Sequence, residues 1–257
     1  MTTEELIAAR RAEPWREALR KSKKNKERTD IPRVEMNELD AEYRSHTRLE
    51  EVNLGLTKEQ AMQEAQRCLD CPNPTCMQGC PVSINIPTFV KNIERGEFLE
   101  AARVLKETSA LQAVCGRVCP QEKQCESKCI HLKMGKPAVA IGYLERFAAD
   151  YERESGNISI PEVAEKNGIK IAVVGSGPAG LSFAGDMAKR GYDVTVFEAL
   201  HEIGGVLKYG IPEFRLPNKI VDVEIEGLRK MGVKFMTNCI VGKTISYDDL
   251  HADGFKG

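Results

Sequence analysis

The spacing of hydrophobic residues predicts helices through the first part of the chain. Residues 57–66 are predicted as a helix, with Thr57 as the N-cap and Gln60 at the capping-box position. The segment 86–111 has apolar residues at helical spacing and is broken at Gly96, which predicts two short helices. A further helix is predicted within residues 138–153.

The pattern changes at Lys170. A strand is predicted over Lys170–Val174, followed by a glycine-rich turn, a helix to about Arg190 and a second strand that ends at Glu198. The fold class is therefore α+β multidomain, with a helical N-terminal domain followed by an incomplete α/β domain of the Rossmann type. The expected divisions are a charged N-terminal extension over 1–50, a helical domain over 51–155, a linker over 156–168 and the Rossmann-type domain over 169–257.

Composition narrows the class of protein. The net charge of −1 leaves no basic footprint for nucleic acid or an anionic membrane surface. No apolar run approaches the roughly 18 residues that cross a bilayer, and the first residues lack the features of a signal peptide. We therefore expect a cytoplasmic protein, in which the nine cysteines are more suited to metal binding or catalysis than to disulfides.

The N-terminal extension carries a short basic run between Lys21 and Arg28, which nearby acidic residues partly offset. Two interpretations are open for it. One is a docking arm for an acidic partner, and the other, favoured for short charge runs, is a solvated helix and linker.

Eight cysteines form two compact groups. The first has the spacing C-x2-C-x4-C-x3-C and the second C-x3-C-x5-C-x3-C; the members are Cys68, Cys71, Cys76 and Cys80, then Cys115, Cys119, Cys125 and Cys129. Such runs are typical of four-iron clusters, in which the last cysteine often serves the other cluster. Structural zinc and free buried thiols are the alternatives. Cys239 lies apart in an apolar segment predicted as a strand, and is interpreted as a small core residue.

The turn after the first predicted strand has the glycine pattern of a dinucleotide-binding motif, and consists of Gly175, Ser176, Gly177, Pro178, Ala179 and Gly180. Gly175 permits the tight turn, Gly177 admits a pyrophosphate, and Gly180 lets the helix pack on the strand. The free N–H groups at the helix N-terminus would face the phosphates.

Glu198 ends the second strand, where a carboxylate accepts hydrogen bonds from a ribose. This acid suits FAD or NAD and argues against the 2′-phosphate of NADP at this site. Gly204 and Gly205 add a second close backbone approach, which favours FAD, and residues 208–212 are suited to lining a flavin ring.

The segments CLDCPNPTCMQGCPV, CGRVCPQEKQCESKC, IGYLERF, GSGPAG and YGIPEFRLP together resemble the small (beta) subunit of bacterial glutamate synthase over about residues 50–257. Its relatives include the large subunit of the electron-bifurcating NADH-dependent ferredoxin:NADP oxidoreductase and the N-terminal half of dihydropyrimidine dehydrogenase. The resemblance implies two 4Fe–4S clusters whose ligands cross between the cysteine groups.

Carried over by position, the resemblance gives the first cluster Cys68, Cys71, Cys76 and Cys129. It gives the second Cys80, Cys119, Cys125 and a non-cysteine ligand at Glu145, with Cys115 as a bystander. From the residues alone, Cys115 and Glu145 both stay open as the fourth ligand. The small Gly142 is expected to allow close approach of the backbone to a cluster. The resemblance also implies FAD contacts at Arg215, Val241 and the backbone of Val118.

The resemblance implies an oxidoreductase in which NADPH reduces FAD and single electrons pass through both clusters to a redox partner subunit. Glutamate synthase is the favoured enzyme; an electron-bifurcating ferredoxin:NADP oxidoreductase or sulfide dehydrogenase subunit is the alternative. An alternative of another class is a non-enzymatic zinc-binding interaction module. The NADPH domain, on the order of 150–200 residues, is expected to lie outside this sequence, so the chain alone is expected to be inactive. No residue in it is assigned a catalytic role.

Overall fold

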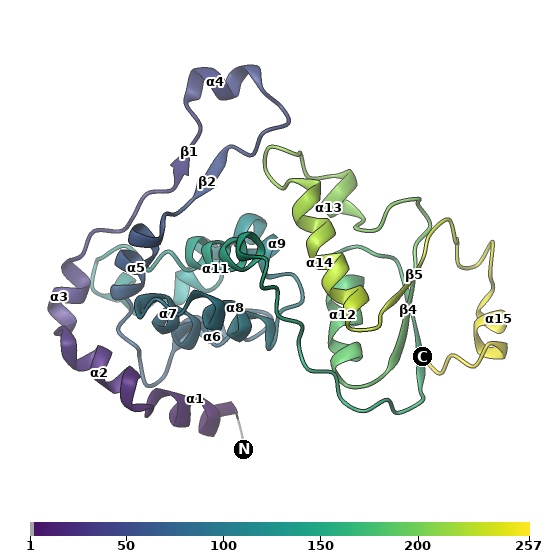
Figure 1. Cartoon of the computed structure of the whole chain (residues 1–257), viewed down its shortest axis with the longest axis horizontal. Coiled ribbons are helices and arrows are strands. Elements are labelled where there is room, and N and C mark those ends of the chain that lie inside the picture. Colours follow the sequence, from purple (N-terminus) through teal and green to yellow (C-terminus); the bar gives the residue numbers. More distant parts are fainter. Residues whose placement is uncertain (1–2) are drawn as a thin grey trace. The chain divides into compact units, whose positions relative to one another are not determined.

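The computed structural model describes residues 3–257, which form two compact units (Figure 1). The first unit comprises the described residues up to Leu39 together with Asn53–Ile158, and the second comprises Asp40–Val52 and Ser159–Gly257. No helix within the described part of the chain is long and apolar enough to cross a membrane.

The first unit is helical, apart from one small antiparallel pair of strands, β1 (Asn37–Glu38) and β2 (Asn53–Gly55). Its helices are α1 (Thr3–Arg11), α2 (Pro14–Ser22), α3 (Asn25–Asp30), α5 (Lys58–Gln66), α6 (Thr75–Gln78), α7 (Ile86–Glu94), α8 (Phe98–Lys106), α9 (Gln112–Val118), α10 (Ile130–Lys133) and α11 (Ile141–Ser155), with 3-10 turns η1 (Gln121–Lys123) and η2 (Glu126–Lys128).

Local sequence signals set several helix ends in this unit. Thr57 and Gln60 form the predicted capping box at the start of α5. Gly96 adopts a φ of +86° and separates α7 from α8, as its position indicates. Helix α11 packs against α5, α7, α8 and α9, and their apolar faces form the core around Phe89, Leu105 and Leu144.

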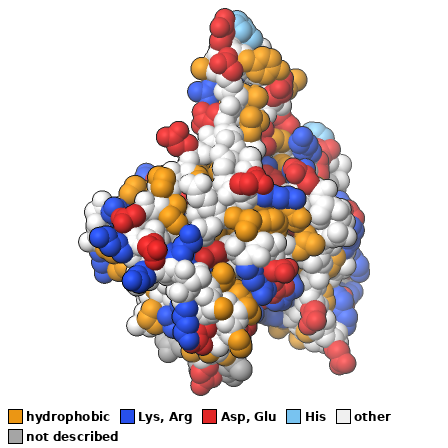
Figure 2. Space-filling model, turned by 60° about the vertical axis from the view of Figure 1, so that its left-hand side comes forward, with side chains coloured by type: hydrophobic (Ala, Val, Ile, Leu, Met, Phe, Trp, Pro, Cys, Tyr) orange, Lys and Arg blue, Asp and Glu red, His pale blue; other side chains and the backbone are white. Residues whose placement is uncertain are grey.

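The basic run is solvated at its lysines, as the favoured interpretation predicts, but buried arginines also anchor the helices that carry it. Lys21, Lys24 and Lys26 are exposed, whereas Arg28 at the end of the run and Arg16 before it are 1% and 0% exposed. Trp15 of α2 also packs its ring under the guanidinium of Arg95, 3.8 Å from the ring centroid. Residues 3–30 are therefore an integral part of the helical unit. On the face shown in Figure 2, acidic and basic side chains are interspersed.

The second unit contains a parallel three-stranded sheet in the order β3 (Lys170–Val174), β4 (Asp193–Phe197), β5 (Lys234–Met236). Its helices are α4 (Ala41–His46), α12 (Pro178–Lys189), α13 (Val206–Tyr209), α14 (Asn218–Lys230) and α15 (Tyr247–Ala252). Strand β3 and helix α12 occupy the positions that the sequence predicts. Cys239 is a core residue, 8% exposed, but it lies beyond the end of β5, so the strand predicted around it is not formed.

Candidate cofactor-binding sites

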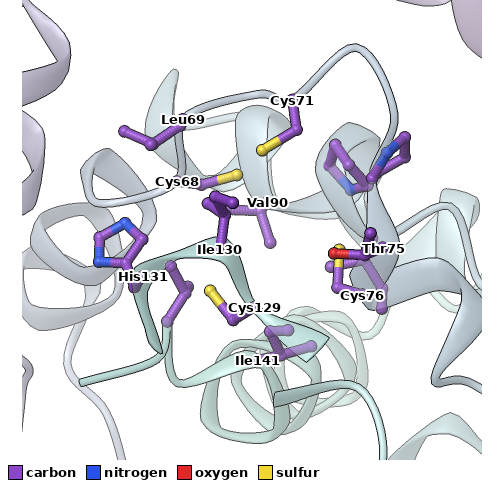
Figure 3. Close-up of a pocket in the computed structure, with 14 residues that line it drawn as sticks. Cys68, Leu69, Cys71, Thr75, Cys76, Val90, Cys129, Ile130, His131 and Ile141 are labelled. Atoms are coloured by element: carbon purple, nitrogen blue, oxygen red, sulfur yellow. The ribbon is translucent and has the colours of Figure 1, made fainter. Parts of the chain in front are cut away.

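Four cysteines from both sequence groups line a single pocket in the helical unit (Figure 3). They are Cys68, Cys71, Cys76 and Cys129, and apolar side chains including Val90, Ile130 and Ile141 complete the wall. These are the four residues that the resemblance assigns to the first cluster. The rest of the first group, Cys80, does not line this pocket.

Backbone structure presents each of these four cysteines to the pocket. Cys68 follows α5, and its N–H donates to the carbonyl of Ala65 at 3.1 Å. Asp70 adopts the left-handed φ of +53°, which turns the chain between Cys68 and Cys71. Cys76 lies in the short helix α6, and Cys129 lies at the junction of η2 and α10. The pocket thus joins residues far apart in sequence.

Burial disfavours the charged thiolate form of these cysteines. Desolvation raises the pKa of Cys68 to about 11 and raises that of Cys76 well above its usual range. The pKa of Cys71 is raised as well, again chiefly by burial. Thiolates, which are the ligating form, would need bound metal to compensate for the cost of burying their charge.

The four cysteine side chains of the pocket do not converge on a site for a single metal ion. Among residues 3–257, no three or more His, Cys, Asp or Glu side chains are arranged to hold a single metal ion. A four-iron cluster does not require that convergence, since each thiolate binds a different iron atom. The donor set, four soft thiolates around a pocket whose other lining residues are apolar except for Thr75 and His131, fits such a cluster.

A second group forms around Glu145, which is 5% exposed and lies in the first turns of α11. Desolvation, together with the charges of Glu145 and Cys80, raises the pKa of Cys119 to about 11. The same two groups act on Cys125, whose pKa is also strongly raised by burial. Glu145 and Cys80 are therefore close enough to Cys119 and to Cys125 to act on both thiols. That these four residues hold the second cluster stays a prediction.

Cys115 and Gly142 have neighbours that the sequence does not reveal. Cys115 lies in α9 one turn before Cys119, and its carbonyl accepts a hydrogen bond from Gln121 Nε2 at 2.8 Å. A Cβ on Gly142 would fall 2.3 Å from Gln121 Cδ, so the space beside Gly142 is taken by Gln121. A side chain at Gly142 would therefore displace Gln121, and the close approach of this backbone to a cluster stays a prediction.

The glycine turn after β3 has the geometry that dinucleotide binding requires. Gly175 has a φ of +95°, and a Cβ on Gly180 would lie 2.1 Å from the carbonyl oxygen of Gly175. A Cβ on Gly177, in contrast, would meet no atom within 4 Å. Gly177 thus borders open space in front of the N-terminus of α12, the position expected for a pyrophosphate.

Gly205 brings a second loop against this turn. It has a φ of +51°, and a Cβ there would lie 2.8 Å from the Cα of Gly177. The N–H of Gly204 donates to Ser176 Oγ at 3.0 Å. The close backbone approach predicted for Gly204 and Gly205 is therefore made to the glycine turn itself.

Glu198 lies just after β4 and holds these loops together. Its carboxylate accepts hydrogen bonds from the N–H of Ser176 at 2.8 Å and of Leu200 at 2.9 Å. Burial tends to raise the pKa of Glu198, but the hydrogen bonds from Ser176 and Leu200 hold that pKa below its usual value. Glu198 is consequently ionised, as a ribose ligand should be.

The remaining predicted flavin contacts lie in different environments. Val118 is half-buried at the C-terminus of α9, next to Cys119. Arg215 is exposed, and Val241 is half-buried and packs against the small core that contains Phe197. Their contact with a flavin stays a prediction.

Sequence reasoning missed the ion pairs around the first cysteine loop. Asp70 is 0% exposed and pairs with Arg16 and Arg20. An acidic residue between two cysteines is a signal that could have been noted. Its arginine partners are 54 and 50 positions away, and no local pattern links them.

Comparison with known proteins supports the assignment of both units. Residues 44–157 match the family described as dihydropyrimidine dehydrogenase domain II, 4Fe-4S cluster, and residues 173–232 match an NAD(P)-binding Rossmann-like domain. The NAD-dependent dihydropyrimidine dehydrogenase subunit PreT of Escherichia coli K12 is 40% identical over 205 residues, which are 80% of this chain and 49% of that protein.

The glutamate synthase [NADPH] small chain of the same strain is 40% identical over 195 residues, 76% of this chain and 41% of that protein. The corresponding small chain of Azospirillum brasilense is 34% identical over 200 residues, covering 78% and 42%. The chain spans about half the length of these curated relatives, with a coverage of 41–49%.

The chain therefore combines a 4Fe–4S domain of the dihydropyrimidine dehydrogenase type with a Rossmann-like NAD(P)-binding domain. The chain is homologous to the glutamate synthase small chains and to the PreT subunits, which confirms the family indicated by its motifs.

Proposed function

We propose that the chain is the cluster-binding and FAD-binding part of a subunit that takes electrons from NADPH and delivers them singly to a partner subunit. The observation that carries this proposal is the pocket lined by Cys68, Cys71, Cys76 and Cys129. It unites cysteines from two separate sequence groups in the ligand set that the family resemblance implies.

In this proposal each cluster has its own set of residues. The pocket cysteines hold the first cluster, and Cys80, Cys119, Cys125 and Glu145 hold the second. The electrostatic effect of Glu145 and Cys80 on both Cys119 and Cys125 supports the second set. Both clusters would supply one-electron chemistry when bound.

FAD is proposed as the ligand of the glycine turn. The turn supplies the N-terminus of α12 for the pyrophosphate, and Glu198 supplies a carboxylate for the ribose. The matching family is described as NAD(P)-binding, so a nicotinamide nucleotide is the other candidate. The feature that favours FAD is the second glycine pair, Gly204 and Gly205, whose loop packs against the backbone of Gly177.

Two terminal reactions are proposed, because relatives of equal identity support each. The glutamate synthase small chain and the PreT subunit from the same strain are both 40% identical to this chain. As the favoured candidate, the subunit would serve glutamate synthase; as the second, it would serve reduction of a pyrimidine base. The partner subunit decides between them.

A reconstitution experiment tests this function. The complete protein, purified without oxygen, is expected to contain iron, sulfide and FAD and to be bleached by NADPH. Addition of a candidate partner subunit with 2-oxoglutarate and glutamine, or with uracil, then identifies the reaction. Protein that holds stoichiometric zinc and no iron would overturn the proposal.

A further inference from the structure

A cluster of buried cations lies behind the loop that carries Cys68 and Cys71. Arg16 is 0% exposed, and its guanidinium binds both carboxylate oxygens of Asp70, with its Nε 3.1 and 3.0 Å away. Arg20 Nη1 binds the same carboxylate at 2.7 Å. Both arginines belong to α2, so the N-terminal helices contact the loop through charged groups.

Three further cations, Arg11, Arg28 and Lys91, donate hydrogen bonds to the backbone of the loop. Arg11 Nε donates to the carbonyl of Asp70 at 2.9 Å, and Lys91 Nζ donates to the carbonyl of Cys68 at 2.6 Å. Arg28 Nη1 donates to the carbonyl of Gln66 at 2.7 Å. These bonds orient the backbone just before Cys68 and between Cys68 and Cys71.

The network carries a surplus of positive charge. Its five cations are Arg11, Arg16, Arg20, Arg28 and Lys91, and its two carboxylates are Asp70 and Glu94. A four-iron cluster held by four thiolates is an anion and becomes more negative when it is reduced. Positive charge nearby therefore stabilises the reduced form, because cluster potential depends on surrounding charge and hydrogen bonding.

We propose that α1 and α2 form a cationic support for the first cluster, in which Arg16 and Arg20 act through Asp70 to position the Cys68–Cys71 loop and raise the cluster's reduction potential. This inference rests on the proposed function, since it assumes an iron–sulfur cluster in that pocket. Arg16 and Arg20 are positioning residues, because they bind Asp70 and not the cysteine sulfurs.

Arg20 is the residue to test. Its side chain is 20% exposed, against 0% for Arg16, so a neutral substitute at Arg20 can be hydrated. Arg16 continues to bind Asp70 when Arg20 is replaced. Lys21 is the matched control, because it is the next residue of α2, is 76% exposed and pairs only locally with Glu17.

The experiment is a redox titration of the complete protein followed by electron paramagnetic resonance, which resolves the signals of the two clusters. Arg20→Gln is expected to lower the reduced-to-oxidised ratio of one cluster at fixed potential by a factor on the order of ten, the usual effect of removing one nearby charge at an effective dielectric constant of about 20. The other cluster serves as an internal reference. Arg20→Lys, which keeps the charge, and Lys21→Gln are both expected to leave the two ratios unchanged.

The outcomes separate this inference from the proposed function. Iron and sulfide in the unsubstituted protein establish the clusters first, and their absence defeats the proposed function before any variant is made. With clusters present, equal ratios in the Arg20→Gln and unsubstituted proteins overturn the cationic support. A shift of the same size in Arg20→Lys overturns it also, since the effect would not follow charge.

Discussion

Gly177 borders open space at the position expected for the pyrophosphate. The site for its Cβ is empty to 4 Å, so Gly177→Val is expected to fold while placing a side chain where a pyrophosphate must approach. FAD content of the purified complete protein should fall to near zero, as measured from the flavin absorbance after denaturation.

Gly227 in α14 provides the control for this substitution, because a Cβ there also meets nothing within 4 Å. Gly227→Val should retain FAD. Glu198→Ala is a less specific test, since Glu198 also holds Ser176 and Leu200. Full flavin content in Gly177→Val would rule out the glycine turn as the phosphate site.

Substitutions of Glu145 and Cys115 are expected to have opposite effects on the second cluster. Glu145 acts electrostatically on both Cys119 and Cys125. Replacing Glu145 with alanine should therefore make one cluster labile or change its resonance spectrum, whereas Cys115→Ser should retain both clusters. Iron content and the spectrum of the reduced protein measure this. Loss of a cluster in Cys115→Ser alone would show that the ligation is all-cysteine.

Helix α5 shows how a local signal positions a ligand. Thr57 Oγ1 accepts a hydrogen bond from the N–H of Gln60 at 3.2 Å. The helix that begins there ends at Gln66, two residues before Cys68. Thr57→Ala should lower the free energy of unfolding of the helical unit by about 1 kcal/mol, the usual cost of losing such a cap. Denaturant unfolding monitored by fluorescence measures it.

Thr29 is the matched control for Thr57, because it is also a surface threonine but its hydroxyl donates only to the carbonyl of Lys26. Thr29→Ala is expected to change the unfolding free energy by less than about 0.5 kcal/mol. Equal losses in the two variants would mean that the cap contributes nothing specific to α5.

The elements that sequence predicted well are those with a signal within a few residues. The capping box of α5, the break at Gly96 and the strand Lys170–Val174 all depend on near neighbours. Burial of Arg16 could not be predicted, because it depends on Asp70, which is 54 positions away. The grouping of Cys129 with Cys68 came from family resemblance, since spacing alone left the pairing open.

At the scale of the whole molecule, the two units should respond differently to iron removal. Metal that binds only the folded state stabilises the unit that holds it. Chelation is therefore expected to lower the unfolding temperature of the helical unit and to leave the Rossmann-like unit unchanged. Calorimetry resolves the two transitions, and Trp15, the single tryptophan, reports the helical one by fluorescence.

The outcome that would contradict this expectation is an equal downward shift of both transitions. That result would mean that the units unfold as one cooperative body. A helical unit whose transition does not move would show that its cysteines hold no stabilising metal.

The pocket that joins Cys76 to Cys129 has a consequence for the order of events during protein synthesis. Three of its four cysteines have been made when the ribosome reaches residue 76, and the fourth follows 53 residues later, the difference between positions 129 and 76. At about 5–20 residues per second, this interval lasts roughly 3–10 s. The machinery that assembles iron–sulfur clusters can therefore encounter a nascent chain with only three of the four thiols. The first cluster can be completed only after Cys129 has emerged from the ribosome.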